Sequence, residues 1–231
     1  MKKVNFFGAY DKIDCILYVA KILTMVGKKV LVVDSTLNQK ARYVIPAINP
    51  TISYVTEFEE IDIAVGFNEL DSIKKYLAIP DENELDYDYA FIDIDNGNAI
   101  ENFEVSPNED NYFVTAFDLY SLKKGLQIFN NIRTPLNLTK VLYAKEMLKE
   151  EDDYLNFLSN GFKIMWKNNS VYFPLENGDA TIFAENQRLE MIKYRQLSTQ
   201  CKESLIYLAE DILKDVSDSH IRKAIRNYEK W

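Results

Sequence analysis

The sequence is poor in the residues that most reactive centres use. Its 231 residues include one histidine, two cysteines and seven glycines. A Ser-His-Asp triad or a Cys-His pair would need His220, which follows a break between two helical patterns, where simple surface exposure explains a histidine. The two cysteines, Cys15 and Cys201, are too far apart in sequence to form a local zinc motif. We therefore expect neither a histidine-dependent hydrolase nor a zinc centre.

Positive charge and long apolar runs are scarce too. The 27 Lys and Arg residues against 36 Asp and Glu give a net charge of −9, which disfavours direct binding to nucleic-acid phosphates. No apolar run approaches the length of a membrane-spanning helix, and no signal peptide is evident before Val4. Because Cys15 is expected to be buried in a helix, the sequence favours a reduced, cytoplasmic setting.

Apolar residues are plentiful enough for a substantial core, since 47% of the chain is hydrophobic and 13% aromatic. Short apolar runs alternate with helical patterns along the first two-thirds, which predicts an α/β fold with a doubly wound, mostly parallel sheet flanked by helices. Strands are expected at Lys3–Phe7, Val30–Asp34, Ser53–Thr56, Tyr89–Asp93, Tyr112–Thr115 and Lys140–Tyr143, with Phe162–Trp166 as a further candidate. Helices are expected at Ile13–Met25, Glu69–Leu77, Leu119–Ile132 and Lys145–Leu158.

The last third of the chain is predicted to be helical. Residues 186–213 are polar on one side and apolar on the other, which predicts one long helix or two. A weak break at Ser217–Ser219 separates them from a basic, amphipathic pattern. We divide the chain into an α/β domain, residues 1–216, and a C-terminal helix, residues 217–231.

The C-terminal helix has two interpretations. Its apolar and basic residues include Ile221, Arg222, Lys223, Ile225, Arg226, Tyr228 and Trp231. Basic side chains together with Tyr and Trp are typical of a helix that lies on an anionic membrane surface. The pattern is only about three turns long, is weakly hydrophobic and contains Glu229. Packing on the domain or on a second subunit is therefore the favoured interpretation.

The first loop lies where a phosphate-binding loop is expected but lacks most of what such a loop needs. A strand ending at Phe7 leads into Gly8, an apolar helix, Gly27 and a second strand ending at Asp34, which is the opening βαβ unit of a phosphate-binding α/β domain. P-loops use several glycines, a Lys and a hydroxyl side chain. Here Gly8 is the one glycine between Phe7 and Ile13.

Bulk and negative charge in this loop oppose a triphosphate. Ala9, Tyr10 and Asp11 stand where glycines would let backbone N–H groups approach an anion. Asp11 and Asp14 would face the phosphates, and two like charges about 4 Å apart repel by roughly 4 kcal/mol at an effective dielectric constant near 20. One such repulsion, if Mg²⁺ did not relieve it, would lower affinity on the order of a thousandfold.

Three motifs in series resemble the ParA/MinD family of P-loop ATPases. GKKVLVVD, residues 27–34, is similar to the family's second strand, with Asp34 as the one acid kept from its D-x-D ending. YDYAFIDIDNG, residues 87–97, places Asp93 at the Walker B position. VTAFDLYSLKKGLQIF, residues 114–129, is similar to the stretch after the next strand. The resemblance spans most of the chain before the last helix and implies a P-loop NTPase-like fold.

The resemblance also implies a nucleotide site, from which this chain departs. The family's loop has the form K-G-G-x-G-K-[ST]. Counting back from Gly27 places Ile13 at the phosphate-binding Lys, whereas a helix one residue shorter would place Lys12 there. Lys12 is thus the candidate phosphate contact. A vestigial or weak nucleotide site would comprise Gly8, Lys12, Asp14 and Asp93, in which Asp14 and Asp93 would bind any Mg²⁺.

Three functional hypotheses follow. The leading one is a non-catalytic ParA/MinD-like module that needs no ATP or Mg²⁺, forms a homodimer and binds protein partners in a bacterial pilus, secretion, conjugation or partition system. The second is an active Mg-ATP switch in which Lys12 contacts phosphate and Asp34 positions water. The third is an unrelated α/β enzyme that uses the acids at the strand ends, Asp34, Asp93 and Asp95, which would otherwise be ordinary solvated residues.

Overall fold

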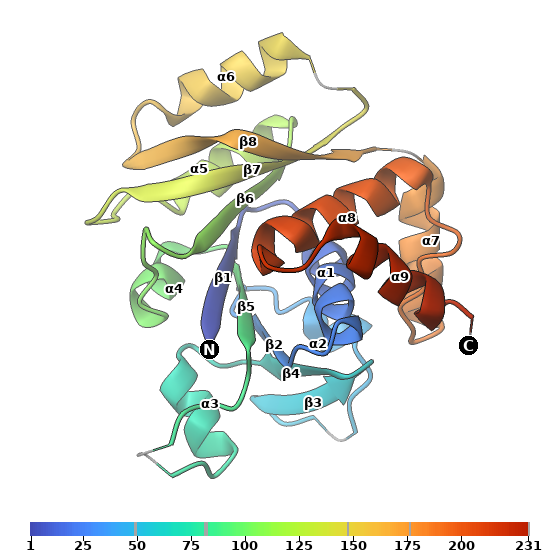
Figure 1. Cartoon of the computed structure of the whole chain (residues 1–231). Helices are drawn as coiled ribbons and strands as arrows, with labels where there is room; N and C mark the ends of the chain where they lie inside the picture. The colour runs from blue at the N-terminus through green and yellow to red at the C-terminus, as the bar shows by residue number, and fades with distance from the viewer. Residues whose placement is uncertain (49, 81–82, 147, 176, 231) are drawn as a thin grey trace.

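One eight-stranded sheet forms the centre of the molecule. The computed structural model describes residues 1–48, 50–80, 83–146, 148–175 and 177–230. Within these ranges the strand order is β3-β4-β2-β5-β1-β6-β7-β8 (Figure 1), and all neighbours are parallel except the β3–β4 hairpin. The strands are β1 (Lys2–Phe7), β2 (Val30–Asp34), β3 (Tyr54–Phe58), β4 (Ile61–Val65), β5 (Tyr89–Ile94), β6 (Asp110–Ala116), β7 (Leu136–Ala144) and β8 (Ile164–Pro174).

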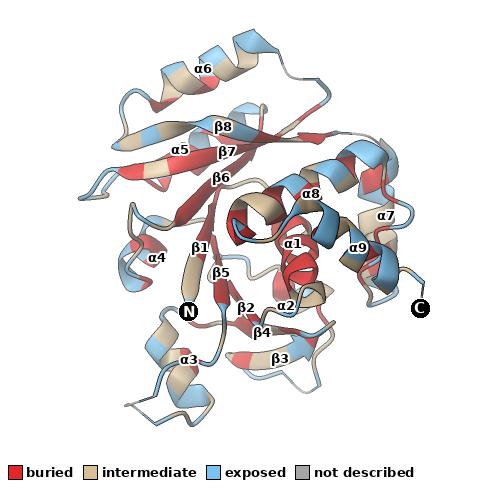
Figure 2. Ribbon diagram, in the orientation of Figure 1, coloured by how far each residue is buried: buried red, intermediate tan, exposed pale blue. Residues whose placement is uncertain are grey.

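Helices cover both faces of this sheet. One face carries α1 (Ile13–Met25), α2 (Ala41–Val44), α7 (Asn177–Arg188), α8 (Thr199–Leu213) and α9 (Asp218–Tyr228). The other carries α3 (Leu70–Tyr76), α4 (Gly97–Asn102), α5 (Leu119–Gln127) and α6 (Lys149–Ser159). The central strands β2 and β6 are buried along their whole length (Figure 2), as parallel strands covered on both faces are. The predicted doubly wound α/β architecture is confirmed.

Helix α1 is buried on almost every side because it lies between the sheet and the pair α8 and α9. It nevertheless contains Lys21, whose side chain is 3% exposed. The Lys21 ammonium lies 2.9 Å from the Glu60 carboxylate, 3.5 Å from that of Glu59 and 4.7 Å from the centre of the Tyr228 ring. A buried charge needs such partners, and these tie the β3–β4 turn and α9 to α1.

The long helix predicted for residues 186–213 is wrong in its first half. Helix α7 covers only the first three of these residues, and α8 starts at Thr199. The side-chain amide of Asn186 donates to the Tyr18 hydroxyl (2.5 Å) and to the Lys193 carbonyl (3.0 Å). These contacts fold the chain back on itself after α7, and the helix ends there.

The hairpin strand β4 and the short helices α2 and α4 are not expected from the sequence. Strands β3 and β4 are joined by a two-residue turn, Glu59–Glu60, with φ angles of +53° and +63°. Turns of this kind usually contain Asn or Gly, so the sequence carries no hairpin signal. Strand β8 also extends to Pro174, beyond the predicted end at Trp166, through a register shift opposite Leu138 and Lys140.

Helix α9 packs on its own domain. Ile221 and Ile225 are buried in the core cluster that contains α1 and α8. Arg222 donates to both carboxylate oxygens of Glu203, with the longer contact at 2.6 Å. The apolar side of this helix is therefore covered by the same chain, while Trp231 lies outside the described residues. Two other predicted residues are exposed, Lys223 and Arg226. No helix within the described ranges is both long and apolar enough to cross a bilayer.

Gly8 follows β1 at a point where only glycine fits. Its N–H donates to the carbonyl of Ile94 (3.1 Å), and its φ angle is +145°. A Cβ atom at this position would lie 2.1 Å from the carbonyl oxygen of Val114 in β6. The close approach of the chain to β6 therefore requires glycine here, independently of any ligand.

Gly8→Ala is expected to destabilise the fold by about 2–4 kcal/mol, because the new methyl group must displace a backbone carbonyl. Gly161→Ala is the matched control, since its Cβ would meet no atom within 4 Å, and its effect should stay within about 0.5 kcal/mol. Urea unfolding measures both. Equal free energies of unfolding for Gly8→Ala and the wild-type protein would contradict the close approach.

Candidate functional site

A cleft lies at the carboxyl ends of β1, β2 and β5, where doubly wound sheets bind ligands. We call it the strand-end cleft. It has a volume of about 300 Å³ and is lined by Gly8, Ala9, Tyr10, Asp11, Lys12, Ile13, Thr36, Asn38, Lys40, Tyr43, Asp93 and Asp95. The structure thus brings three predicted site residues together: Gly8, Lys12 and Asp93.

Lys12 immediately precedes α1 and turns its side chain into the protein. Its Nζ lies 2.6 Å from Oδ1 of Asp93 and donates to the Gly8 carbonyl at 2.9 Å. The side chains of Lys12 and Asp93 are only 3% and 5% exposed. The one basic residue of the first loop is therefore already bound to a carboxylate and a carbonyl, the same kinds of oxygen ligand that a phosphate would offer.

Asp93 is held in an unusual electrostatic environment. Burial raises its pKa to about 7, the ammonium of Lys12 opposes this rise, and the neighbouring carboxylates of Asp34 and Asp95 add to it. Asp34 is its direct neighbour across the β2–β5 ladder. Because the pKa in the folded state lies above that of an unfolded Asp, ionising this carboxyl destabilises the fold as the pH rises toward 7.

The other two strand-end acids both accept hydrogen bonds from the segment after β2. Asp34, 1% exposed, accepts hydrogen bonds from the Thr36 N–H (3.0 Å), the Thr36 hydroxyl (2.6 Å) and the Ala41 N–H (2.8 Å). Asp95 accepts from the Leu37 N–H at 3.0 and 3.1 Å. No three acid, His or Cys side chains in the described part of the chain form a cluster that could hold a metal ion.

Asp14, a predicted Mg²⁺ ligand, faces a different cavity. Its carboxylate accepts two hydrogen bonds from the side chain of Gln187, at 2.7 and 3.0 Å, and burial raises its pKa. This second cavity, also about 300 Å³, is bordered by Tyr10, Asp14, Tyr143 and Gln187 among others. The Tyr10 ring packs on Tyr143, with centroids 4.8 Å apart, and it borders both cavities.

Lys40 is a cleft residue that the sequence did not indicate. It belongs to the irregular segment after β2, and its ammonium forms an ion pair with Asp11. No motif marks this position, and only the path of the chain toward α2 brings it to the cleft. Both lysines that line the cleft are thus paired with carboxylates, and Asp95 adds a further negative charge.

These residues do not fit a triphosphate well. The loop between β1 and α1 has five residues, of which Gly8 is the one glycine. The charges that line the cleft are three carboxylates and two ammonium groups, so the wall repels rather than attracts an anion. The side chains do not fill the cleft, however, which stays open to a ligand of other chemistry.

Comparison with solved structures places this fold among known proteins. A plasmid partition protein from Borrelia burgdorferi bound to AMPPNP is 14% identical, with a TM-score of 0.56 over 93% of this chain and 99% of that one. A chain of the MinC:MinD cell division protein complex from Aquifex aeolicus is 12% identical, with a TM-score of 0.57 over 94% and 98%. The MinD cell division protein of the same organism is 13% identical, with a TM-score of 0.55 over 94% and 99%.

The chain has the ParA/MinD fold. The agreement extends over nearly the full length of both chains in each comparison. At 12–14% identity it concerns the fold alone. No protein-family model matches the sequence, and no curated protein matches it either. Within the ParA/MinD fold, Lys12 and Asp93 occupy the crevice that the sequence motifs predicted.

Lys12→Met is expected to make stability depend more steeply on pH. Without the ammonium, the pKa of Asp93 rises further above about 7, because the nearest opposite charge is lost. At pH 8.5 the loss of one partner of a buried ion pair should cost about 3 kcal/mol. At pH 5.5, where Asp93 is protonated, the loss should fall below about 1 kcal/mol.

The matched control is Lys29→Met, which removes a fully exposed ion pair with Asp86 and should have the same small effect at both pH values. Urea unfolding at pH 5.5 and 8.5 measures all three proteins. A Lys12→Met loss that is equal at the two pH values would show that Lys12 does not neutralise Asp93.

Proposed function

We propose that this protein is a nucleotide-independent binding module built on the ParA/MinD scaffold. One observation carries the proposal: the ammonium of Lys12 is bound to Asp93 and to the Gly8 carbonyl inside the protein. To reach a phosphate, Lys12 would have to leave a buried carboxylate unpaired. Breaking such a pair costs about 3–5 kcal/mol, or more than a hundredfold in affinity.

The alternative is an active, divergent Mg-ATP switch. The open volume of the strand-end cleft and the AMPPNP bound by the similar Borrelia protein favour it. It would require Lys12 to contact phosphate, Asp14 or Asp93 to bind Mg²⁺ and Asp34 to position water. Asp14 borders the other cavity and Asp34 is hydrogen-bonded within its own loop, so three of these four residues would have to change partners.

We further propose that the module acts as a homodimer and binds protein partners. Between β2 and β3 four large apolar residues are 73–95% exposed: Leu37, Tyr43, Ile48 and Ile52. Tyr43 borders the strand-end cleft, and the other three lie in the same β2–β3 connection. We propose that they form one apolar surface beside the cleft, since contiguous exposed apolar groups mark interaction surfaces. The net charge of −9 favours proteins over nucleic acid as partners, and a pilus, secretion, conjugation or partition assembly would suit such a role.

The nucleotide question is decided by calorimetry. Titration of Mg-ATP into the protein is expected to give no saturable heat, with any Kd weaker than about 1 mM, and Lys12→Ala should give the same trace. The reason is that the cation needed for phosphate is already neutralised. A micromolar Kd that Lys12→Ala abolishes would replace the binding-module proposal with the active switch.

The dimer is tested by charging its proposed surface. The double variant Ile48→Asp, Ile52→Asp is expected to sediment as a monomer at concentrations where the wild-type chain is a dimer, because two carboxylates would lose water on association. Phe157→Asp, at an apolar residue of α6 that is 69% exposed, is the control and should leave the dimer intact. A wild-type monomer, or a double variant that still dimerises, rejects this surface.

A further inference from the structure

The cavity that Asp14 faces is lined by four aromatic side chains, Tyr10, Tyr143, Phe173 and Phe183. It is bordered by α1, α7 and the ends of β7 and β8, and we call it the aromatic cavity. The Tyr143 ring stacks on Phe173, with centroids 4.9 Å apart, and the Tyr10 ring packs on Tyr143 at 4.8 Å. A row of rings therefore runs from the partly buried Tyr10 to the buried Phe173.

The charged residues that line the aromatic cavity are three acids, Asp11, Asp14 and Asp179, and one base, Lys40. Asp11 and Lys40 form an ion pair and neutralise each other. Asp179 is 5% exposed, and its two oxygens accept from the N–H (2.6 Å) and the hydroxyl (2.7 Å) of Ser198. Asp179 therefore holds the start of α8 in place, and Asp14 is the acid that this network leaves over.

Asp14 has no cation bound to it within the described residues. Its two oxygens share one donor, the side-chain nitrogen of Gln187, at 2.7 and 3.0 Å. A carboxylate can accept about four hydrogen bonds, so Asp14 can accept from a further donor. Burial raises its pKa, and the bonds from Gln187 oppose that rise more than the distant Lys40 does. The N-terminus of α1 adds a partial positive charge, which leaves most of the carboxylate charge uncompensated.

Aromatic rings beside such a carboxylate favour an organic cation. The faces of aromatic rings attract ammonium groups, and a carboxylate forms its strongest hydrogen bonds with charged donors. The net negative charge of the lining repels anions. A hard metal ion needs several oxygen ligands, and the described residues contain no cluster of three that could supply them. A protonated amine is favoured over a quaternary ammonium, because only the amine has an N–H to donate to Asp14.

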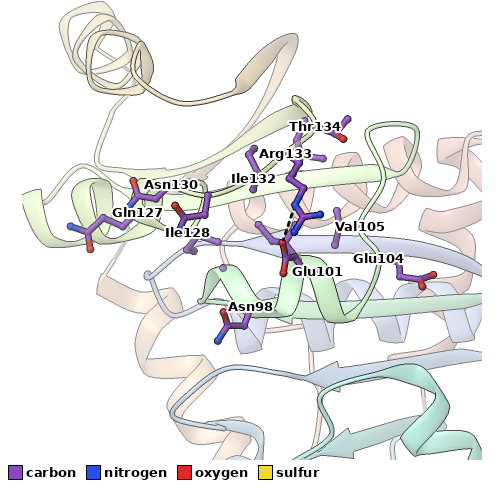
Figure 3. A pocket seen from close by; sticks show the side chains of 14 residues that line it. Asn98, Glu101, Glu104, Val105, Gln127, Ile128, Asn130, Ile132, Arg133 and Thr134 are labelled. Carbon is purple, nitrogen blue, oxygen red and sulfur yellow. Dashed lines mark ion pairs between the residues drawn. The ribbon is translucent and has the colours of Figure 1, made fainter.

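The groove on the other face of the sheet is larger but does not favour one class of ligand. It lies between α4 and the segment from α5 to β7, with a volume of about 680 Å³ (Figure 3). Its sides carry exposed amides such as those of Asn98 and Asn130, which water can satisfy. Its one ion pair joins Nε of Arg133 to the Glu101 carboxylate at 3.7 Å and is exposed, so it contributes little.

We propose that the aromatic cavity binds a small protonated amine with a hydrophobic body. The ammonium group donates to the Asp14 carboxylate, and the body of the ligand packs against Tyr10, Tyr143 and Phe173. The cavity volume of about 300 Å³ is at the lower end for ligand sites and suits a molecule with one ring or a short chain. The inference does not rest on the nucleotide-independent module proposed above, because Lys12 and Asp93 do not line this cavity.

The test compares two probes of nearly the same shape, phenethylamine and phenethyl alcohol, which differ in charge. Each is titrated into the full chain by calorimetry in phosphate buffer near pH 7.5, since Tris is itself an amine. Phenethylamine is expected to bind with a Kd below about 1 mM. Phenethyl alcohol should bind at least about tenfold more weakly, because it lacks the cation that Asp14 and the rings attract.

Two variants locate the binding in the cavity. Asp14→Asn keeps an oxygen for Gln187 but removes the charge, and it should weaken phenethylamine at least about tenfold. Tyr10→Leu removes a ring and should weaken it at least about threefold. The matched control is Asp153→Asn, at an exposed acid of α6, which changes the net charge equally and should leave the Kd unchanged. Thermal midpoints within about 4 °C of the wild type show that the variants fold. If Asp14→Asn does not fold, Tyr10→Leu decides.

Three results would each overturn the inference. The first is a phenethylamine Kd weaker than about 1 mM. The second is a neutral probe, phenethyl alcohol or adenosine, that binds as tightly as the amine. The third is a pair of folded variants, Asp14→Asn and Tyr10→Leu, that bind the amine as well as Asp153→Asn does.

The Mg-ATP titration tests a different side chain and separates the two proposals. ATP binding that Lys12→Ala abolishes, together with amine binding that Asp14→Asn abolishes, would remove nucleotide independence and keep the amine site. A protein that binds neither ATP nor the amine would keep nucleotide independence and remove the amine site.

Discussion

The buried ion pair between Lys12 and Asp93 is the constraint on which the candidate site depends. It joins the start of α1 to the end of β5, and β1 lies beside β5 in the sheet. The carbonyl of Gly8, the residue after β1, accepts a hydrogen bond from the same ammonium. Two charges taken out of water stay buried only when each has a partner of opposite charge or a hydrogen bond. Any ligand of the strand-end cleft must therefore leave this pair in place or supply a new partner for both charges. A polyanion could supply only one of the two.

The position of the candidate site could be predicted from the sequence, but the directions of its side chains could not. Its apolar runs located β1, β2 and β5 within one residue, and parallel strand ends meet at one edge of a sheet, so Asp34 and Asp93 were expected side by side. The direction of Lys12 depends on the register that sets Phe6 opposite Asp93, and on a loop short enough to turn the ammonium inward. Local residue patterns predict neither the strand register nor the conformation of this loop. For the same reason the sequence did not indicate Lys40, which reaches the cleft through an irregular segment.

Where fold prediction failed, tertiary contacts overrode local preference. Residues 186–198 have a helical pattern, yet the helix ends at Arg188. The side-chain amide of Asn186 donates instead to the Tyr18 hydroxyl, which is far away in sequence, and to the Lys193 carbonyl, which lies beyond the helix end. The β3–β4 hairpin closes through two glutamates at positive φ, an unfavourable conformation that Lys21 compensates by pairing with both. Both the end of α7 and the β3–β4 hairpin are stabilised by polar contacts between different elements, with a buried Asn186 or Lys21 side chain as one partner. The periodicity of apolar residues along the sequence does not predict such contacts.

The charged side chains that line the strand-end cleft are already used within the chain. Lys12, Lys40 and Asp95 all have partners there, so ligand binding in the cleft must exchange one set of contacts for another and gains little. Exposed amides elsewhere on the surface have only water to displace, and a hydrogen bond that replaces water in both partners is worth about 1 kcal/mol. A ligand of the strand-end cleft must first separate charges that already bind each other, which costs more than such a bond returns.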